Sequence, residues 1–232
     1  MANWFLGRAL AEEAEAENAA WSFLGEGTAF WVTVAVLLVV GVAVYLVTRK
    51  KSSKKSFWTA KTMAVGAMCM ALSSVLSLIK LWSMPMGGSV TPASMLPLLL
   101  FAYCYGVGPG MVLGALYGVM QFLLDGMAWA ALGAIPNLLD YPIAFGLLGL
   151  AGCFRGSKAK MTAGFVLGCF GRFMASFLSG FIFYGQYAPE GVNPVWYSLT
   201  YNGSYMLVEC IICIALGLLV GERLAKELKK VA

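Results

Sequence analysis

Histidine is absent from the 232 residues of this chain. Its absence excludes the serine–histidine and cysteine–histidine pairs that activate catalytic nucleophiles. It also excludes HExxH zinc sites and histidine-ligated haem. The phosphate-binding sequence GxxxxGK[ST] of many nucleotide hydrolases is missing as well. If the protein drives uphill transport, another chain must therefore supply the ATPase.

Charged residues are scarce: they make up 12% of the chain, and 60% of the residues are hydrophobic. A soluble domain carries about 25% charged residues. Together with a mean hydropathy of +0.80, this composition predicts a polytopic membrane protein with no room for a soluble catalytic domain. An intramembrane rhomboid-like protease would need histidine, and a phospholipid head-group transferase would need a dense aspartate cluster. We therefore expect no enzyme activity, cofactor, metal or nucleic-acid partner.

Cysteine is present but offers little chemistry. All six cysteines lie in apolar stretches. Cys210 and Cys213 form a CxxC pattern, yet they have no second pair and no histidine beside them. Buried, inert thiols are the interpretation that this setting favours, and nothing in the spacing indicates a disulfide framework.

Seven apolar segments are candidate membrane spans, for which about 20 residues are needed. They cover residues 30–47, 60–79, 94–105, 109–125, 137–154, 161–184 and 196–221. The predicted fold is an all-α membrane protein, a six-helix core preceded by one extra N-terminal transmembrane helix. We divide the chain into an extracellular acidic segment (1–29), a retained anchor (30–48), a basic cytoplasmic linker (49–56) and the six-span core (57–232).

Basic residues predict the orientation, because lysine and arginine collect on the cytoplasmic side. One cluster covers 49–55 and Lys61, the second is Arg155, Lys158 and Lys160, and the third is Arg223, Lys226, Lys229 and Lys230. Seven alternating spans place all three clusters on one side. The N-terminus is then outside and the C-terminus cytoplasmic.

Aromatic and amide side chains crowd residues 184–205, where a loop enters a very apolar segment. Polar groups in lipid are costly unless they are satisfied. The cluster is therefore either an interfacial aromatic belt or the wall of a polar ligand site. A belt accounts for Tyr184, Tyr187 and Trp196. It does not account for Asn202, which shares a helix face with Glu209 two turns further on.

Three acidic residues, Asp125, Asp140 and Glu209, lie within or at the rim of spans, where ionisable groups are candidates for function. The predicted orientation places Asp140, with Tyr141, Tyr197 and Asn202, in the outer half of the bilayer. A carboxylate, an amide and aromatic faces together suit a small, flat cation. The alternatives are a helix-start role for Asp140 and a structural hydrogen-bonding role for Glu209.

Small residues recur at four-residue spacing in two spans, which permits close helix approach. Gly110, Gly114 and Gly118 form one stripe, for which packing inside the core is the simplest interpretation. An alanine face in the segment 60–71 is either a packing face or a docking surface for a partner.

Several long segments resemble one family in the same order along the chain. They are KLWSMPMGGSVTPASMLPLLLFAYCYGVGPG (80–110), LLDYPIAFGLLGLAGCFR (138–155) and the run from GRF (171–173) through IFYGQYAPEGVNPVWYSLTYNGSY. They resemble the thiamine-binding S-components of energy-coupling factor transporters, over about residues 57–230. The resemblance implies a six-helix protein of the bacterial cell membrane that captures thiamine from outside. A shared transmembrane coupling subunit and two cytoplasmic ATPases would then power its release.

The resemblance also implies roles for individual residues. It implies a ligand-binding carboxylate at Asp140 with Tyr141 beside it, a stacking ring at Tyr184, and polar contacts at Tyr197 and Asn202. The segment from Met84 through Gly87 and Gly88 to Ser89 corresponds to the family's gating segment, Trp129 to an aromatic of the next outer loop, and Ala67 and Ala71 to the AxxxA docking motif.

The chain departs from the family pattern at two positions of the implied site. Ser176 stands where the family often has histidine beside the ligand, and Tyr184 where some members have tryptophan. The hypothesis of an S-component for another cationic or pyrimidine compound therefore stays open, as does a membrane scaffold without a small ligand. Residues 1–56 lie outside the resemblance.

Overall fold

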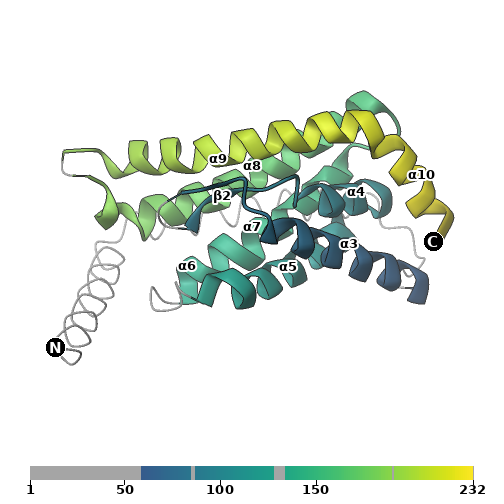
Figure 1. Ribbon diagram of the computed structural model, residues 1–232, viewed down its shortest axis with the longest axis horizontal. Coiled ribbons are helices and arrows are strands. Elements are labelled where there is room, and N and C mark those ends of the chain that lie inside the picture. The colour runs from purple at the N-terminus through teal and green to yellow at the C-terminus, as the bar shows by residue number, and fades with distance from the viewer. Residues whose placement is uncertain (1–58, 85–86, 128–133, 190, 232) are drawn as a thin grey trace.

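The computed structural model describes residues 59–84, 87–127, 134–189 and 191–231, and these residues are predominantly helical (Figure 1). The predicted all-α membrane fold is confirmed for them. The acidic segment, the anchor and the basic linker predicted within residues 1–56 lie outside the described residues, as does Trp129.

The elements follow the predicted order of spans, with two short strands in addition. They are α3 (Ala60–Leu78), β1 (Trp82–Ser83), β2 (Ser89–Val90), α4 (Leu96–Tyr105), α5 (Val107–Gln121), α6 (Ala134–Leu138), α7 (Ala144–Leu147), α8 (Lys158–Ile182), α9 (Pro194–Leu216) and α10 (Glu222–Val231). Five stretches of the described chain are long and apolar enough to cross a membrane: Ala60–Leu78, Val107–Gly126, Ile135–Cys153, Lys158–Ile182 and Pro194–Lys230.

The short span predicted over 94–105, the second of the core, corresponds to α4, which is only ten residues long and buried along its whole length. Ten helical residues span about 15 Å, half of a bilayer's hydrocarbon core. Pro97 in its first turn suits a helix start. Gly106, with φ of 103°, ends α4 and lets the chain turn directly into α5. The short helix therefore forms the centre of the core, and longer helices surround it.

The glycine stripe on α5 packs as the sequence predicted. A Cβ atom at Gly114 would collide with the backbone of Phe145, and one at Gly118 would collide with the backbone of Tyr141. α5 therefore lies directly against the segment that carries Asp140, and this close approach fixes where that carboxylate sits.

The segment between α3 and α4 contains a small hairpin that the sequence did not predict. β1 and β2 pair antiparallel, with Trp82 opposite Val90 and Ser83 opposite Ser89. Leu81 donates its backbone N–H to the Val90 carbonyl at 2.9 Å, and Met84 donates to Gly88 at 2.7 Å. The hairpin gives a fixed shape to most of the predicted gating segment, apart from residues 85–86.

The span predicted over 137–154 is not one regular helix. A π-helical turn at Leu139–Ile143 separates α6 from α7, and a 3₁₀ segment at Leu148–Cys153 follows. Pro142 lies inside the π turn and has no N–H to donate to the preceding turn. Such turns inside helices are frequent at functional sites. Here the turn carries Asp140 and Tyr141.

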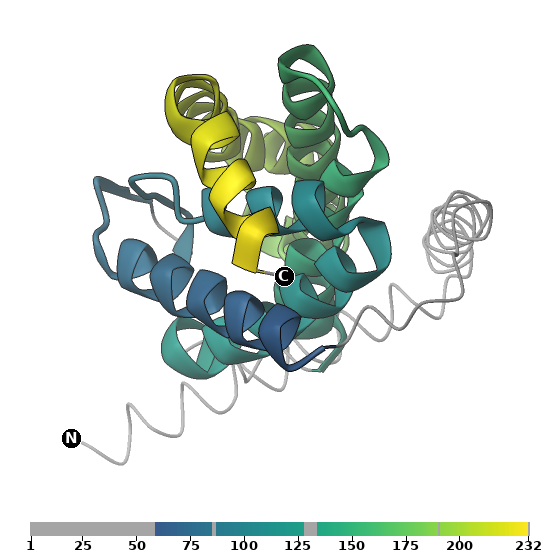
Figure 2. The same cartoon turned by 90° about the vertical axis from the view of Figure 1, so that its right-hand side faces the viewer.

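The last two long helices run side by side, and α10 bends away from α9 (Figure 1). A π-helical turn at Gly217–Gly221 lies at the bend. α10 then crosses one end of the bundle (Figure 2), where Tyr105 donates its hydroxyl to the Leu228 carbonyl at 2.7 Å. Lys158, at the start of α8, pairs with Glu222 of α10 at 3.8 Å. Two of the three basic clusters thus meet at this end.

Candidate functional site

A cavity opens toward the other end of α8 and α9, away from α10. It holds about 900 Å³ of atom-free space, including its mouth and open solvent. Its walls come from the predicted gating segment, α5, the π turn at Leu139–Ile143, α7, α8, the loop after α8, and α9. The lining residues are Gly87, Gly88, Ser89, Gln121, Asp140, Tyr141, Phe145, Arg172, Ser176, Gly180, Tyr184, Tyr197, Ser198, Tyr201, Asn202 and Tyr205.

The carboxylate of Asp140 stands in the wall of this cavity. Ser179 of α8 donates its hydroxyl to Oδ2 of Asp140 at 2.7 Å. Ser176, one turn earlier on α8, also lines the cavity. Since Asp140 lies in the π turn rather than in the first turn of a regular helix, its position does not fit a simple helix-start role.

Tyrosines form the opposite wall along one face of α9. Tyr197 and Tyr201 have ring centroids 5.9 Å apart, and Tyr201 and Tyr205 are also 5.9 Å apart, edge to face. Tyr184, in the loop after α8, adds a further ring. Aromatic faces attract cations, so these rings together with the Asp140 carboxylate would suit a flat cation.

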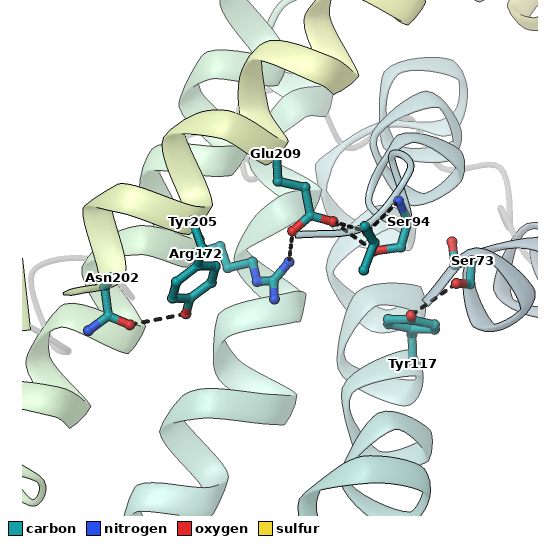
Figure 3. Close-up of polar contacts among 8 residues, drawn as sticks. Ser73, Ser94, Tyr117, Arg172, Asn202, Tyr205 and Glu209 are labelled. Carbon is teal, nitrogen blue, oxygen red and sulfur yellow. Dashed lines mark hydrogen bonds and ion pairs between the residues drawn. The ribbon is translucent and has the colours of Figure 1, made fainter. Parts of the chain in front are cut away.

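Asn202 is fixed by its neighbours in this wall. It donates to the Ser198 carbonyl at 3.1 Å. It also accepts from the Tyr205 hydroxyl at 3.0 Å (Figure 3). Ser198 donates its hydroxyl to the Phe177 carbonyl at 2.8 Å. The absence of a side chain at Gly180 lets these polar groups approach α8, since a Cβ there would lie 2.5 Å from Ser198 Oγ. The amide therefore has one defined orientation.

Gly87, Gly88 and Ser89 of the predicted gating segment line the cavity on the side of the hairpin. The N–H of Gly88 donates to the Tyr201 hydroxyl at 3.0 Å. A Cβ at Gly88 would lie 2.8 Å from that oxygen and 3.0 Å from the ring of Tyr205. Glycine is thus required for the hairpin to lie this close to α9.

Most of the predicted site residues are brought together here. Nine of them line the cavity: Asp140, Tyr141, Tyr184, Tyr197, Asn202, Ser176, Gly87, Gly88 and Ser89. Two others do not line it. Met84 lies beside α9, where Ser204 donates to its sulfur at 3.5 Å, and Glu209 is buried behind the wall.

The aromatic cluster turns out to serve both alternatives, with different residues in each. Trp196 is 63% exposed and Tyr187 is 44% exposed, as a belt requires. Tyr184, which a belt would also explain, lines the cavity instead. The cluster is therefore divided between the surface and the cavity wall.

Among the lining residues that were not predicted, Arg172 is the charged one. It lies within the α8 span, and a charged residue inside a span is itself a signal of function. Its guanidinium carbon lies 4.1 Å from the centre of the Phe145 ring. Metal binding has no comparable basis, since within the described residues no three histidine, cysteine or acidic side chains group together.

Known proteins can now be compared with this chain. A sequence model of the family described as Thiamine transporter protein (Thia_YuaJ) matches residues 63–228, which is most of the chain. The chain belongs to this thiamine transporter family. It is accordingly a multi-pass membrane protein of a transporter family.

Individual members of the family are similar to the chain over most of their own length. The thiamine transporter ThiT of Bacillus subtilis (strain 168) is 39% identical over 145 residues, covering 56% of this chain and 73% of the relative. ThiT of Lacticaseibacillus paracasei is 33% identical over 134 residues, covering 52% and 67%. A solved structure of ThiT from Listeria monocytogenes superposes with a TM-score of 0.62 at 20% identity, covering 72% of this chain and 96% of that one. The last comparison supports the fold.

Proposed function

We propose that this protein is the substrate-capture subunit of an energy-coupling factor importer and that it binds thiamine in the cavity. The observation that carries the proposal is the Asp140 carboxylate facing a wall of tyrosines within one cavity. Thiamine combines a fixed positive charge on a flat ring with a polar aminopyrimidine, so the carboxylate, the rings and the Asn202 amide each have a matching group. Both curated relatives are named thiamine transporters.

Binding by the purified chain tests the proposal directly. We expect saturable, one-to-one binding of thiamine in calorimetric titration of the detergent-solubilised protein. Titrations with the isolated aminopyrimidine and with a quaternary ammonium salt separate a thiamine site from a site for another pyrimidine or cation. The second possibility has a specific basis, because Ser176 lines the cavity where the family often has histidine. If none of the three compounds binds saturably, a membrane scaffold without a small ligand would be favoured.

The sequence also supports an energy source in other chains. No nucleotide-binding phosphate loop is present, so uphill uptake would need a transmembrane coupling subunit and two cytoplasmic ATPases. Ala67 and Ala71, both exposed on α3, are the proposed docking face. The gating segment, which touches α9 through Gly88 and Tyr201, would open to admit the ligand.

The proposed orientation has the cavity facing outward and the basic end of the bundle in the cytoplasm. We expect a cysteine introduced at Ser157, in an otherwise cysteine-free chain, to resist an impermeant thiol reagent added to intact cells. Ser157 caps α8 within the second basic cluster, and basic residues favour the cytoplasmic side. A cysteine at Val192, exposed in the loop before α9, is the matched control and should react. Labelling at Ser157 with protection at Val192 would invert the orientation.

A further inference from the structure

Behind the cavity wall lies a buried carboxylate that makes no contact with the cavity itself. The side chain of Glu209 on α9 is buried, with 1% of the residue exposed. One of its oxygens, Oε1, accepts hydrogen bonds from Thr91 at 2.5 Å and Ser94 at 2.8 Å. The second oxygen, Oε2, lies 3.9 Å from Nη1 of Arg172 (Figure 3). Both oxygens of Glu209 are therefore engaged.

Arg172 connects this carboxylate with the cavity, since it lines the cavity and its side chain is 13% exposed. Within the described residues, its Nε and Nη1 atoms have no hydrogen-bond acceptor. Arginine always carries its charge and can hold an anion with two parallel hydrogen bonds. Without a counter-charge, Arg172 would make this part of the cavity an anion site.

The charges are separated along α8. Arg172 lies seven residues before Ser179, the residue that holds Asp140, which corresponds to about 10 Å along the helix. The three charged groups, Asp140, Arg172 and Glu209, sum to one negative charge. In an interior of low dielectric, this net negative charge attracts a cationic ligand and repels an anionic one strongly. A cation with an uncharged tail therefore suits the net charge of this site better than the phosphate ester of the same cation does.

We infer that Glu209 determines specificity: by pairing with Arg172 it makes the site accept the cationic vitamin and disfavour its phosphorylated form. The inference rests on the proposed function and identifies the substrate class of the same site. Glu209 acts through Arg172 rather than by touching the ligand. Thr91 and Ser94 hold the carboxylate in place. Thr91 follows β2 directly and Ser94 lies three residues further on, so they join this pair to the hairpin.

The test is the ratio of two dissociation constants, thiamine monophosphate over thiamine, for the purified protein. For the parent we expect a ratio of about ten or more, and for Glu209→Gln a ratio at least about tenfold smaller, because an unbalanced Arg172 charge attracts phosphate. The amide oxygen of glutamine still accepts from Thr91 and Ser94. Glu222→Gln on α10, where the side chain is 42% exposed, is the control and should keep the parent ratio.

A charge-balanced double variant separates charge from packing. Arg172→Gln combined with Glu209→Gln removes both charges, so its ratio should return to within about threefold of the parent's, even if both affinities fall. If Glu209→Gln does not fold, Arg172→Gln alone decides, because leaving the Glu209 charge unbalanced should raise the ratio.

Several results would overturn the inference. They are a parent that binds both ligands equally, a Glu209→Gln ratio equal to the parent's, or an Arg172→Gln ratio that does not rise. A parent that binds neither compound would instead refute the proposed function, so the two failures are distinguishable.

Discussion

Asp140→Asn is expected to weaken thiamine binding by roughly 30-fold or more. Losing a hydrogen-bonded charge in a desolvated site costs about 2–5 kcal/mol, and each tenfold change in affinity corresponds to about 1.4 kcal/mol. Asparagine has nearly the same shape and can still accept the hydrogen bond from Ser179. The substitution thus removes mainly the charge that faces the ligand. The measurement is a calorimetric titration of the folded variant with thiamine.

Asp125→Asn is the matched control for this experiment. Asp125 is also an aspartate in a π-helical turn, Phe122–Gly126, but it is exposed, pairs with Lys80 at 3.0 Å and does not line the cavity. Exposed ion pairs contribute about 0–1 kcal/mol, so its affinity should stay close to that of the parent. If Asp140→Asn binds thiamine like the parent while the control also does, the carboxylate does not hold the ligand.

Hydropathy and residue type predicted much of what surrounds Asp140. The order of the six core spans was predictable because five of them are long apolar runs and the remaining one, α4, is a short apolar run. The carboxylate at 140 and the amide at 202 stood out because such groups are rare inside spans. In the structure both residues line the same cavity, together with tyrosines from the segment 184–205.

The features that the sequence did not reveal depend on contacts between distant segments. Pro142 alone could not tell that the chain would form a π turn there, since proline also permits a kink or a helix end. The β1–β2 hairpin is held by only a few hydrogen bonds and by Tyr201. Two-residue strands leave no periodic pattern to recognise.

Glu209 illustrates the same limit. The spacing from Asn202 correctly placed both on one face of α9, and both are buried. The partners of Glu209 come from other segments, however: Arg172 of α8 lies 3.9 Å from one oxygen, and Thr91 and Ser94 donate hydrogen bonds to the other (Figure 3). Helical spacing reports a shared face and not the neighbour that each residue meets. The structural hydrogen-bonding role left open for Glu209 therefore agrees with its contacts.

The second large effect is expected on the outer face of α3. Ala67→Trp together with Ala71→Trp should reduce thiamine uptake to background, because large side chains prevent close helix approach. Thiamine affinity should stay within about threefold of the parent's, because surface substitutions rarely change stability by more than about 0.5 kcal/mol. The buried face of α3, with Thr62, Val65 and Cys69, is a different one, and neither alanine lines the cavity.

Uptake of labelled thiamine by cells that co-express the coupling subunit and ATPases, paired with titration of the purified variant, measures both quantities. Val112→Trp with Leu116→Trp is the matched control, since these two residues are also four apart and are 46% and 53% exposed on α5. The control should transport normally if α3 is the docking face and α5 faces lipid. Lost binding in the α3 variant would mean that the alanines support the fold of the site, and normal uptake by that variant would remove α3 as the docking surface. Only loss of uptake with intact binding, confined to α3, fits a capture subunit that must dock through this helix to be emptied.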